Sequence, residues 1–140
     1  MFLVAATKFK CSWDNNKKSF YRAFNGVYGK VGRCASEEVV IKLINAKYVP
    51  ILLYGMDACP LLVSDSRSVD FIVNRIFMKI FKTTDIDIVK ECQLMFGFEL
   101  LSHVIVKRKI NFFNRFLASE NIICKVLRSF VFDELTSLNC

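Results

Sequence analysis

The sequence predicts a mainly α-helical array of about five to six helices with a short N-terminal strand or hairpin. Three observations support this fold class. Apolar residues recur every three or four positions along most of the 140 residues, and capping residues, prolines and glycines separate these periodic segments. The first ten or so residues lack the helical period. Because there is no internal repeat, low-complexity tract or linker, we expect one domain by size.

The N-terminal segment is expected to form a strand or two, since Phe2, Leu3, Val4 and Phe9 alternate irregularly. Asp14 is a suitable N-cap for a first helix that runs to about Gly32. Counting 100° per residue from Phe20, four apolar positions fall within about 50° of one direction and form the core face of the helix. These positions are Phe24, Val27, Tyr28 and Val31.

The opposite side of this helix carries Lys18, Arg22, Gly29 and Arg33 and forms a basic strip. Each of the three glycines in the segment costs about 1 kcal/mol against alanine in a helix. Close approach of a backbone or a phosphate would explain Gly29. For Gly26 and Gly32 we favour a frayed or kinked helix end.

Ser36 is expected to cap the next helix, with Glu37 and Glu38 in its first turn. Pro50 lacks an N–H and clashes one turn back, so a kink or restart should separate helices over 36–48 and 51–58. Asp57 lies in the restarted piece without a second carboxylate nearby, so we do not expect it to bind a metal or act as an acid or base.

Ser64 or Asp65 is expected to cap a strongly periodic helix that ends at about Lys82. Phe71 and Met78 point away from its apolar stripe, which suggests burial on both sides of the helix. The stripe consists of Val69, Ile72, Val73, Ile76, Phe77, Ile80 and Phe81.

Three further helices complete the array. One begins at Thr84 or Asp85 and ends near Gly97, with capping as the role of Asp85 and Asp87. The second covers 99–118 and places Lys109 inside its apolar arc, where the stem should pack while the ammonium reaches water. The last begins at about Asn121. Its apolar residues are Ile122, Ile123, Val126, Leu127, Phe130 and Val131.

Charge and hydropathy both suggest a binding role. Of the net charge of +7, residues 1–33 contribute +6, from seven Lys/Arg and one acid, Asp14. Such a concentration attracts polyanions, although an ordinary solvated basic face would also explain it. A smaller excess lies at Lys107, Arg108, Lys109 and Arg115. At 54% hydrophobic residues the chain should expose apolar surface for another domain or partner, yet no stretch is long enough to span a membrane.

The residues needed for most catalytic or metal chemistry are missing. The six cysteines form no C-x-x-C pair, and the single histidine, His103, is expected at the surface or in a cap. We therefore expect no metal and no cofactor, with the cysteines as buried thiols in a reducing, intracellular compartment (cytoplasm and/or nucleus). No Asp-Asp pair or phosphate-binding glycine loop is present, so the chain alone is not expected to be an enzyme.

Three blocks of the sequence stand in a recognisable order. The first is Phe20-Tyr21-Arg22-Ala23-Phe24-Asn25-Gly26-Val27-Tyr28-Gly29-Lys30, the second is Ser36-Glu37-Glu38-Val39-Val40, and the third is Tyr48-Val49-Pro50-Ile51-Leu52-Leu53-Tyr54-Gly55-Met56-Asp57-Ala58. Together they resemble the region just downstream of the polymerase palm in reverse transcriptases of non-LTR (LINE-type) retrotransposons. The resemblance covers roughly residues 8–115 and is most specific over 19–60.

The resemblance implies a non-catalytic C-terminal fragment of an RNA-directed DNA polymerase. Residues 1–13 would be a remnant of the palm-edge strands, 14–62 thumb-like helices and 63–140 the post-thumb helical region. Its partners would be an RNA–DNA template–primer duplex and a palm domain or a protein on the exposed apolar surface. The phosphate contacts would be Lys17, Lys18, Arg22, Lys30 and Arg33. The competing hypothesis is a small domesticated helical protein-interaction module.

Overall fold

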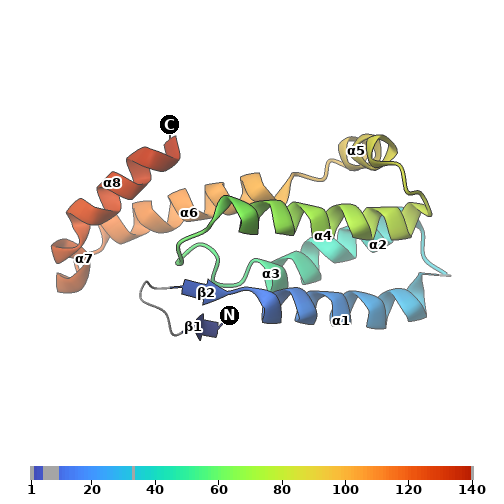
Figure 1. Cartoon of the computed structure of the whole chain (residues 1–140), viewed down its shortest axis with the longest axis horizontal. Coiled ribbons are helices and arrows are strands. Elements are labelled where there is room, and N and C mark those ends of the chain that lie inside the picture. The colour runs from blue at the N-terminus through green and yellow to red at the C-terminus, as the bar shows by residue number, and fades with distance from the viewer. Residues whose placement is uncertain (1, 5–9, 33, 140) are drawn as a thin grey trace.

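The computed structural model describes residues 2–4, 10–32 and 34–139, and the fold is mainly helical as expected. The chain begins with β1 (Phe2–Val4) and β2 (Lys10–Ser12), which pair antiparallel with Phe2 opposite Ser12. This two-stranded sheet confirms the predicted N-terminal strand or hairpin. The helices that follow it form an elongated array (Figure 1).

The first helix, α1 (Asp14–Val31), buries Phe20 and Phe24 on the predicted face. Trp13, and not Asp14, occupies the N-cap position. The hydroxyl of Ser12 donates to the Asp14 carboxylate at 3.3 Å, so that carboxylate is engaged ahead of the helix. The predicted helix start was therefore wrong by one residue.

The second helical stretch contains the irregularity expected at Pro50. It comprises α2 (Glu37–Leu43) with Ser36 at the N-cap position, a π-helical turn η1 (Ile44–Tyr48) and α3 (Val49–Leu52). The Val49 N–H bonds to the carbonyl of Ile44, five residues back, so the helix widens just before the proline. The irregularity was predicted, but its form as a π-turn was not.

The predicted helix over 51–58 was wrong, because α3 ends at Leu52 and turns follow. The buried Asn16 amide donates to the carbonyls of Leu52 (3.3 Å) and Tyr54 (2.9 Å). Gly55 has a φ of 78°, in the left-handed region that favours glycine. The helix therefore ends here, because these two carbonyls accept hydrogen bonds from Asn16 and because Gly55 takes a left-handed conformation.

The longest helix, α4 (Val63–Phe81), buries its predicted stripe, with Phe81 partly buried against the core. It begins before the predicted caps, and the Asp65 carboxylate accepts the Leu62 N–H at 3.2 Å. Phe71 is exposed, whereas Met78 packs against the core. Burial on both sides thus holds only for the part of the helix near Met78.

The next helix, α5 (Ile86–Met95), follows as predicted. The Asp85 carboxylate caps it by accepting the Asp87 N–H at 2.9 Å, which confirms capping as the role of Asp85. Just beyond its end, Gly97 takes a φ of 61°. Val89 is the fully buried residue through which α5 joins the core.

The C-terminal third consists of α6 (Leu101–Ala118), α7 (Ile122–Val126) and α8 (Arg128–Asn139), with α8 folded back along α6 (Figure 1). The predicted single last helix is interrupted at Leu127. Of its expected apolar face only Val131 is buried, and the remaining five residues are exposed. Much of the apolar surface at this end of the molecule is therefore uncovered.

Lys109 differs from its prediction. Its side chain is buried, and Nζ lies 3.7 Å from Glu134 Oε1 on α8 and 5.6 Å from the centre of the Phe113 ring. The ammonium pairs with a carboxylate and an aromatic face instead of reaching open water, because α8 covers this side of α6.

A single cluster of buried side chains holds together the helices from α1 to α5 and the first half of α6. It draws on residues from Trp13 to Cys59 and from Val69 to Ile105. Phe20, Leu52 and Phe77 are completely buried within it. None of the helices in the described ranges combines the length and apolarity needed to cross a membrane.

Candidate nucleic-acid interface

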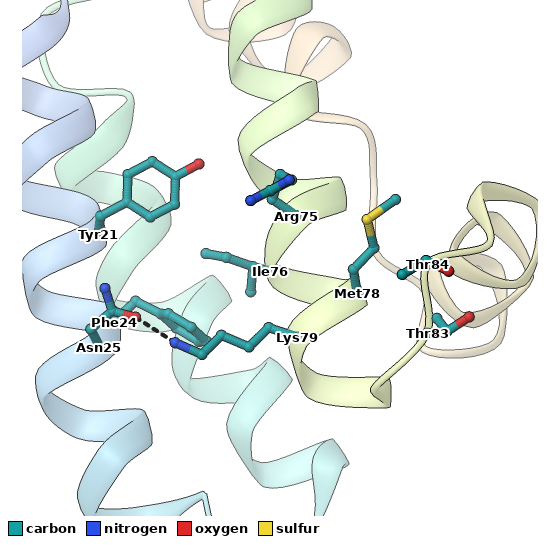
Figure 2. Close-up of a pocket in the computed structure, with 9 residues that line it drawn as sticks. All are labelled: Tyr21, Phe24, Asn25, Arg75, Ile76, Met78, Lys79, Thr83 and Thr84. Atoms are coloured by element: carbon teal, nitrogen blue, oxygen red, sulfur yellow. Dashed lines mark hydrogen bonds between the residues drawn. The ribbon is translucent and has the colours of Figure 1, made fainter.

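A groove of about 490 Å³ lies between α1 and α4. Figure 2 shows side chains from both helices converging on it. No acidic residue is among those that line it, which are Tyr21, Phe24, Asn25, Arg75, Ile76, Met78, Lys79, Thr83 and Thr84.

Lys79 bridges the groove from α4 to α1. Its Nζ donates to Asn25 Oδ1 at 2.8 Å (Figure 2). The same Nζ lies 5.6 Å from the ring centre of Phe24 and 5.4 Å from that of Tyr28. The Tyr28 hydroxyl donates to the Lys79 carbonyl at 3.3 Å. These contacts fix a cation at the mouth of the groove without neutralising it.

Arg75 lies one turn earlier on α4, and Figure 2 shows its guanidinium opposite the Tyr21 ring. Burial raises the pKa of Tyr21 above its ordinary value, and the charge of Arg75 acts in the opposite direction. The Arg75 guanidinium also lies 6.0 Å from the centre of the exposed Phe71 ring. Arg75 is itself solvent-exposed and so accessible to an anion.

Lys18 and Arg22 continue this positive surface along α1. Both are exposed and stand one turn apart, about 6 Å along the helix axis. They lie three residues from Tyr21 and Asn25 respectively, so the basic strip borders the groove. Among the described residues, none of Lys18, Arg22, Arg75 and Lys79 forms an ion pair.

The other predicted contacts lie apart from this group. Lys17 turns toward the core side of α1, with Asp14 at 4.0 Å and its side chain 23% exposed. Lys30 is exposed in the last turn, about 100° around the helix from Gly29. Arg33 lies outside the described residues. The strip defined by the structure is therefore Lys18 and Arg22, joined by Arg75 and Lys79.

The glycines of α1 occupy two different environments. Apart from the backbone of the helix itself, a Cβ on Gly26 or Gly29 would meet nothing within 4 Å among the described residues. A Cβ on Gly32 would come within 2.6 Å of the Tyr28 carbonyl oxygen and 2.9 Å of the Tyr28 ring. Gly32 directly follows the last residue of α1, at a helix end as expected, and its close contact with Tyr28 leaves no room for a Cβ.

The second basic excess is partly neutralised. Lys107 pairs with Glu99, and Lys109 pairs with Glu134. The Arg115 Nε–H donates to the Asn111 carbonyl at 3.3 Å. The groove between α1 and α4 is therefore the stronger candidate for an anionic ligand.

Arg75 and Lys79 were not predicted as site residues from the sequence. Their spacing of four residues on the flank of the α4 stripe was visible in the sequence. The packing of that flank beside α1 was not, since it depends on the tertiary arrangement.

Other chemically active groups do not add to the site. Within the described ranges no three His, Cys, Asp or Glu side chains are grouped so that they could hold a metal ion. His103 is exposed, which confirms its expected place at the surface.

In comparisons with known proteins, no family model, curated protein or solved structure matches the chain.

Proposed function

We propose that this chain binds the sugar–phosphate backbone of an RNA–DNA duplex through Lys18, Arg22, Arg75 and Lys79. In this proposal it is the thumb and post-thumb region of a non-LTR retrotransposon reverse transcriptase and acts in the cytoplasm or nucleus. It positions the template–primer duplex and carries no polymerase chemistry itself, because the sequence lacks the palm aspartates of the resembled family.

The observation that carries the proposal is a groove without a lining acid, lined by Arg75 and Lys79 of α4. The exposed Lys18 and Arg22 border it on α1 by their helical spacing from Tyr21 and Asn25. Phosphate contacts of this kind fix the position of a duplex without reading its sequence. The resemblance places Arg22 in the first of the three matching blocks, on the same helix as this groove. Sequence resemblance and groove electrostatics thus support the same surface.

The test is binding of the purified chain to a fluorescein-labelled RNA–DNA hybrid by fluorescence anisotropy over a range of salt concentrations. Replacing Lys18 and Arg22 by Glu should weaken binding by about tenfold or more, because two attractive charges become repulsive. The slope of log affinity against log salt should fall by about two, one for each lost phosphate contact.

The matched control is Lys47→Glu/Lys90→Glu, which changes the net charge equally at exposed positions on η1 and α5. It should cause a smaller loss of affinity than the strip variant. Equal losses for the two variants, at equal helical circular dichroism, would mean that the groove has no particular role.

A second candidate function is a helical protein-interaction module. The observation that favours it is the exposed apolar surface of α7 and α8, formed by Ile122, Ile123, Val126, Leu127, Phe130 and Phe132. Contiguous exposed apolar surface is typical of binding sites for other proteins. In the reverse transcriptase proposal, the same surface would be covered by a palm domain or another protein.

A further inference from the structure

Cys11 and Cys59 bring two thiols together from distant parts of the chain. Cys11 lies on β2, and Cys59 lies in the segment between α3 and α4, 48 residues later. Their Sγ atoms are 2.8 Å apart. Figure 1 shows β2 next to this segment. A disulfide bond requires about 2.05 Å between the sulfurs, so closure needs a movement of less than about 1 Å.

The two thiols differ in accessibility. Cys11 is partly exposed, whereas Cys59 is buried in the core. Burial raises the pKa of the Cys59 thiol to about 12, and the contact with Cys11 acts in the same direction. An oxidant from solution therefore reacts first with Cys11. The buried Cys59 lies next to Cys11 and can then react with the oxidised Cys11 sulfur.

These positions revise the expectation that the cysteines are buried. Cys59 is buried as predicted, but Cys34 is exposed and Cys92 and Cys124 are partly exposed. Among the described residues, a sulfur–sulfur contact is found for Cys11 and Cys59 alone. The contact distinguishes this pair from the other described cysteines.

We propose that Cys11 and Cys59 form a reversible intramolecular disulfide, with a low-molecular-weight disulfide such as oxidised glutathione as the oxidant. The Cys11 thiolate, after losing its proton to solvent, attacks one glutathione sulfur and expels the other glutathione as a thiolate, which takes up a proton. The Cys59 thiol then loses its proton to solvent and attacks Cys11 Sγ, which expels the second glutathione as a thiolate that takes up a proton. In total, the two protein thiols lose two electrons and two protons, and one oxidised glutathione becomes two reduced ones.

The disulfide would close a covalent loop that contains α1, α2, η1 and α3. Closing a loop of this length restricts the unfolded chain and should raise the melting temperature by about 10 °C. The proposal is independent of the proposed function, because it concerns the connection between β2 and the end of the α3 region and requires no nucleic acid.

The experiment is equilibration of the full chain in glutathione redox buffers, followed by alkylation, trypsin digestion without reduction and mass spectrometry. The expected product joins peptides 11–17 and 48–67, and dithiothreitol reverses it. The Cys11→Ser variant should lose both this product and the rise in melting temperature. The control Cys34→Ser/Cys124→Ser should keep both.

Three outcomes would overturn the proposal. They are persistent glutathione on Cys11 without closure, cross-links distributed over other cysteines, and recovery of both thiols unreacted in oxidising buffer. If Cys11→Ser fails to fold, peptide mapping of the unmodified chain still decides between closure and these outcomes.

Discussion

At the scale of single residues, the same side chain type has different roles according to what packs over it. Lys79 and Lys109 both lie beside aromatic rings, yet Lys79 faces a groove without acids while Lys109 pairs with Glu134 beneath α8. The helical period of the sequence placed Lys109 on the apolar arc of its helix, but it did not identify the residue that pairs with Lys109. The sequence could show the position of each lysine on its helix, but not the helix that covers it.

Gly29, on the same side of α1 as Lys18 and Arg22, offers the sharpest residue-scale test of the basic strip. A Cβ at Gly29 or Gly26 meets open space, so alanine at either position should stabilise α1 by about 0.5–1 kcal/mol. If a phosphate approaches the backbone at Gly29, Gly29→Ala should weaken hybrid binding several-fold while it raises stability. Urea denaturation and fluorescence anisotropy on the same samples measure the two effects.

Gly26→Ala is the matched control, since it should bring the same stabilisation without loss of affinity. Equal affinity of the two variants would remove close phosphate approach as the reason for Gly29. Gly32→Ala should instead destabilise the protein, because its Cβ would overlap the Tyr28 carbonyl.

At the scale of elements, the sequence predicted what local chemistry determines. The α4 stripe, the Ser36 and Asp85 cap positions and the irregularity at Pro50 were all predicted, because each depends on residues within one or two turns. The end of α3 was not. It depends on Asn16, which lies on another helix and binds the carbonyls that a longer α3 would have paired internally.

This dependence predicts that Asn16 holds the connection between α1 and the end of α3. Asn16→Ala removes the donor from two carbonyls, and we expect a loss of about 1–3 kcal/mol in the free energy of unfolding. Urea denaturation measures the loss, and the amide hydrogens of residues 53–58 should exchange faster.

Asn15→Ala, at the exposed neighbouring position, should change stability by less than about 0.5 kcal/mol. Similar losses for both variants would contradict a specific role for the Asn16 amide.

At the scale of the whole molecule, the candidate groove and the exposed apolar surface lie on different parts of the array. Lys18 and Arg22, which border the groove, follow from the basic face of α1, while Arg75 and Lys79, which line it, depend on how α4 packs beside α1. The excess of apolar residues in the composition indicated that surface would be left uncovered. Its location on α7 and α8 was not predicted, because the sequence pattern of 122–131 is that of a core-facing helix.

The uncovered surface of α7 and α8 should make the isolated chain associate. Ile123, Val126 and Phe130 are 65%, 75% and 68% exposed, so replacing all three by Gln should remove apolar surface from water with little loss of packing. We expect lower binding of a hydrophobic dye and a smaller apparent mass by light scattering, at an unchanged melting temperature.

Leu94→Gln/Met95→Gln, at exposed positions on α5, is the control and should change both readouts less. A cooperative monomer with little dye binding before any substitution would contradict an uncovered docking face. A defined oligomer that the triple variant dissociates would instead favour the interaction module, because the face would then have its partner in a second copy of the chain.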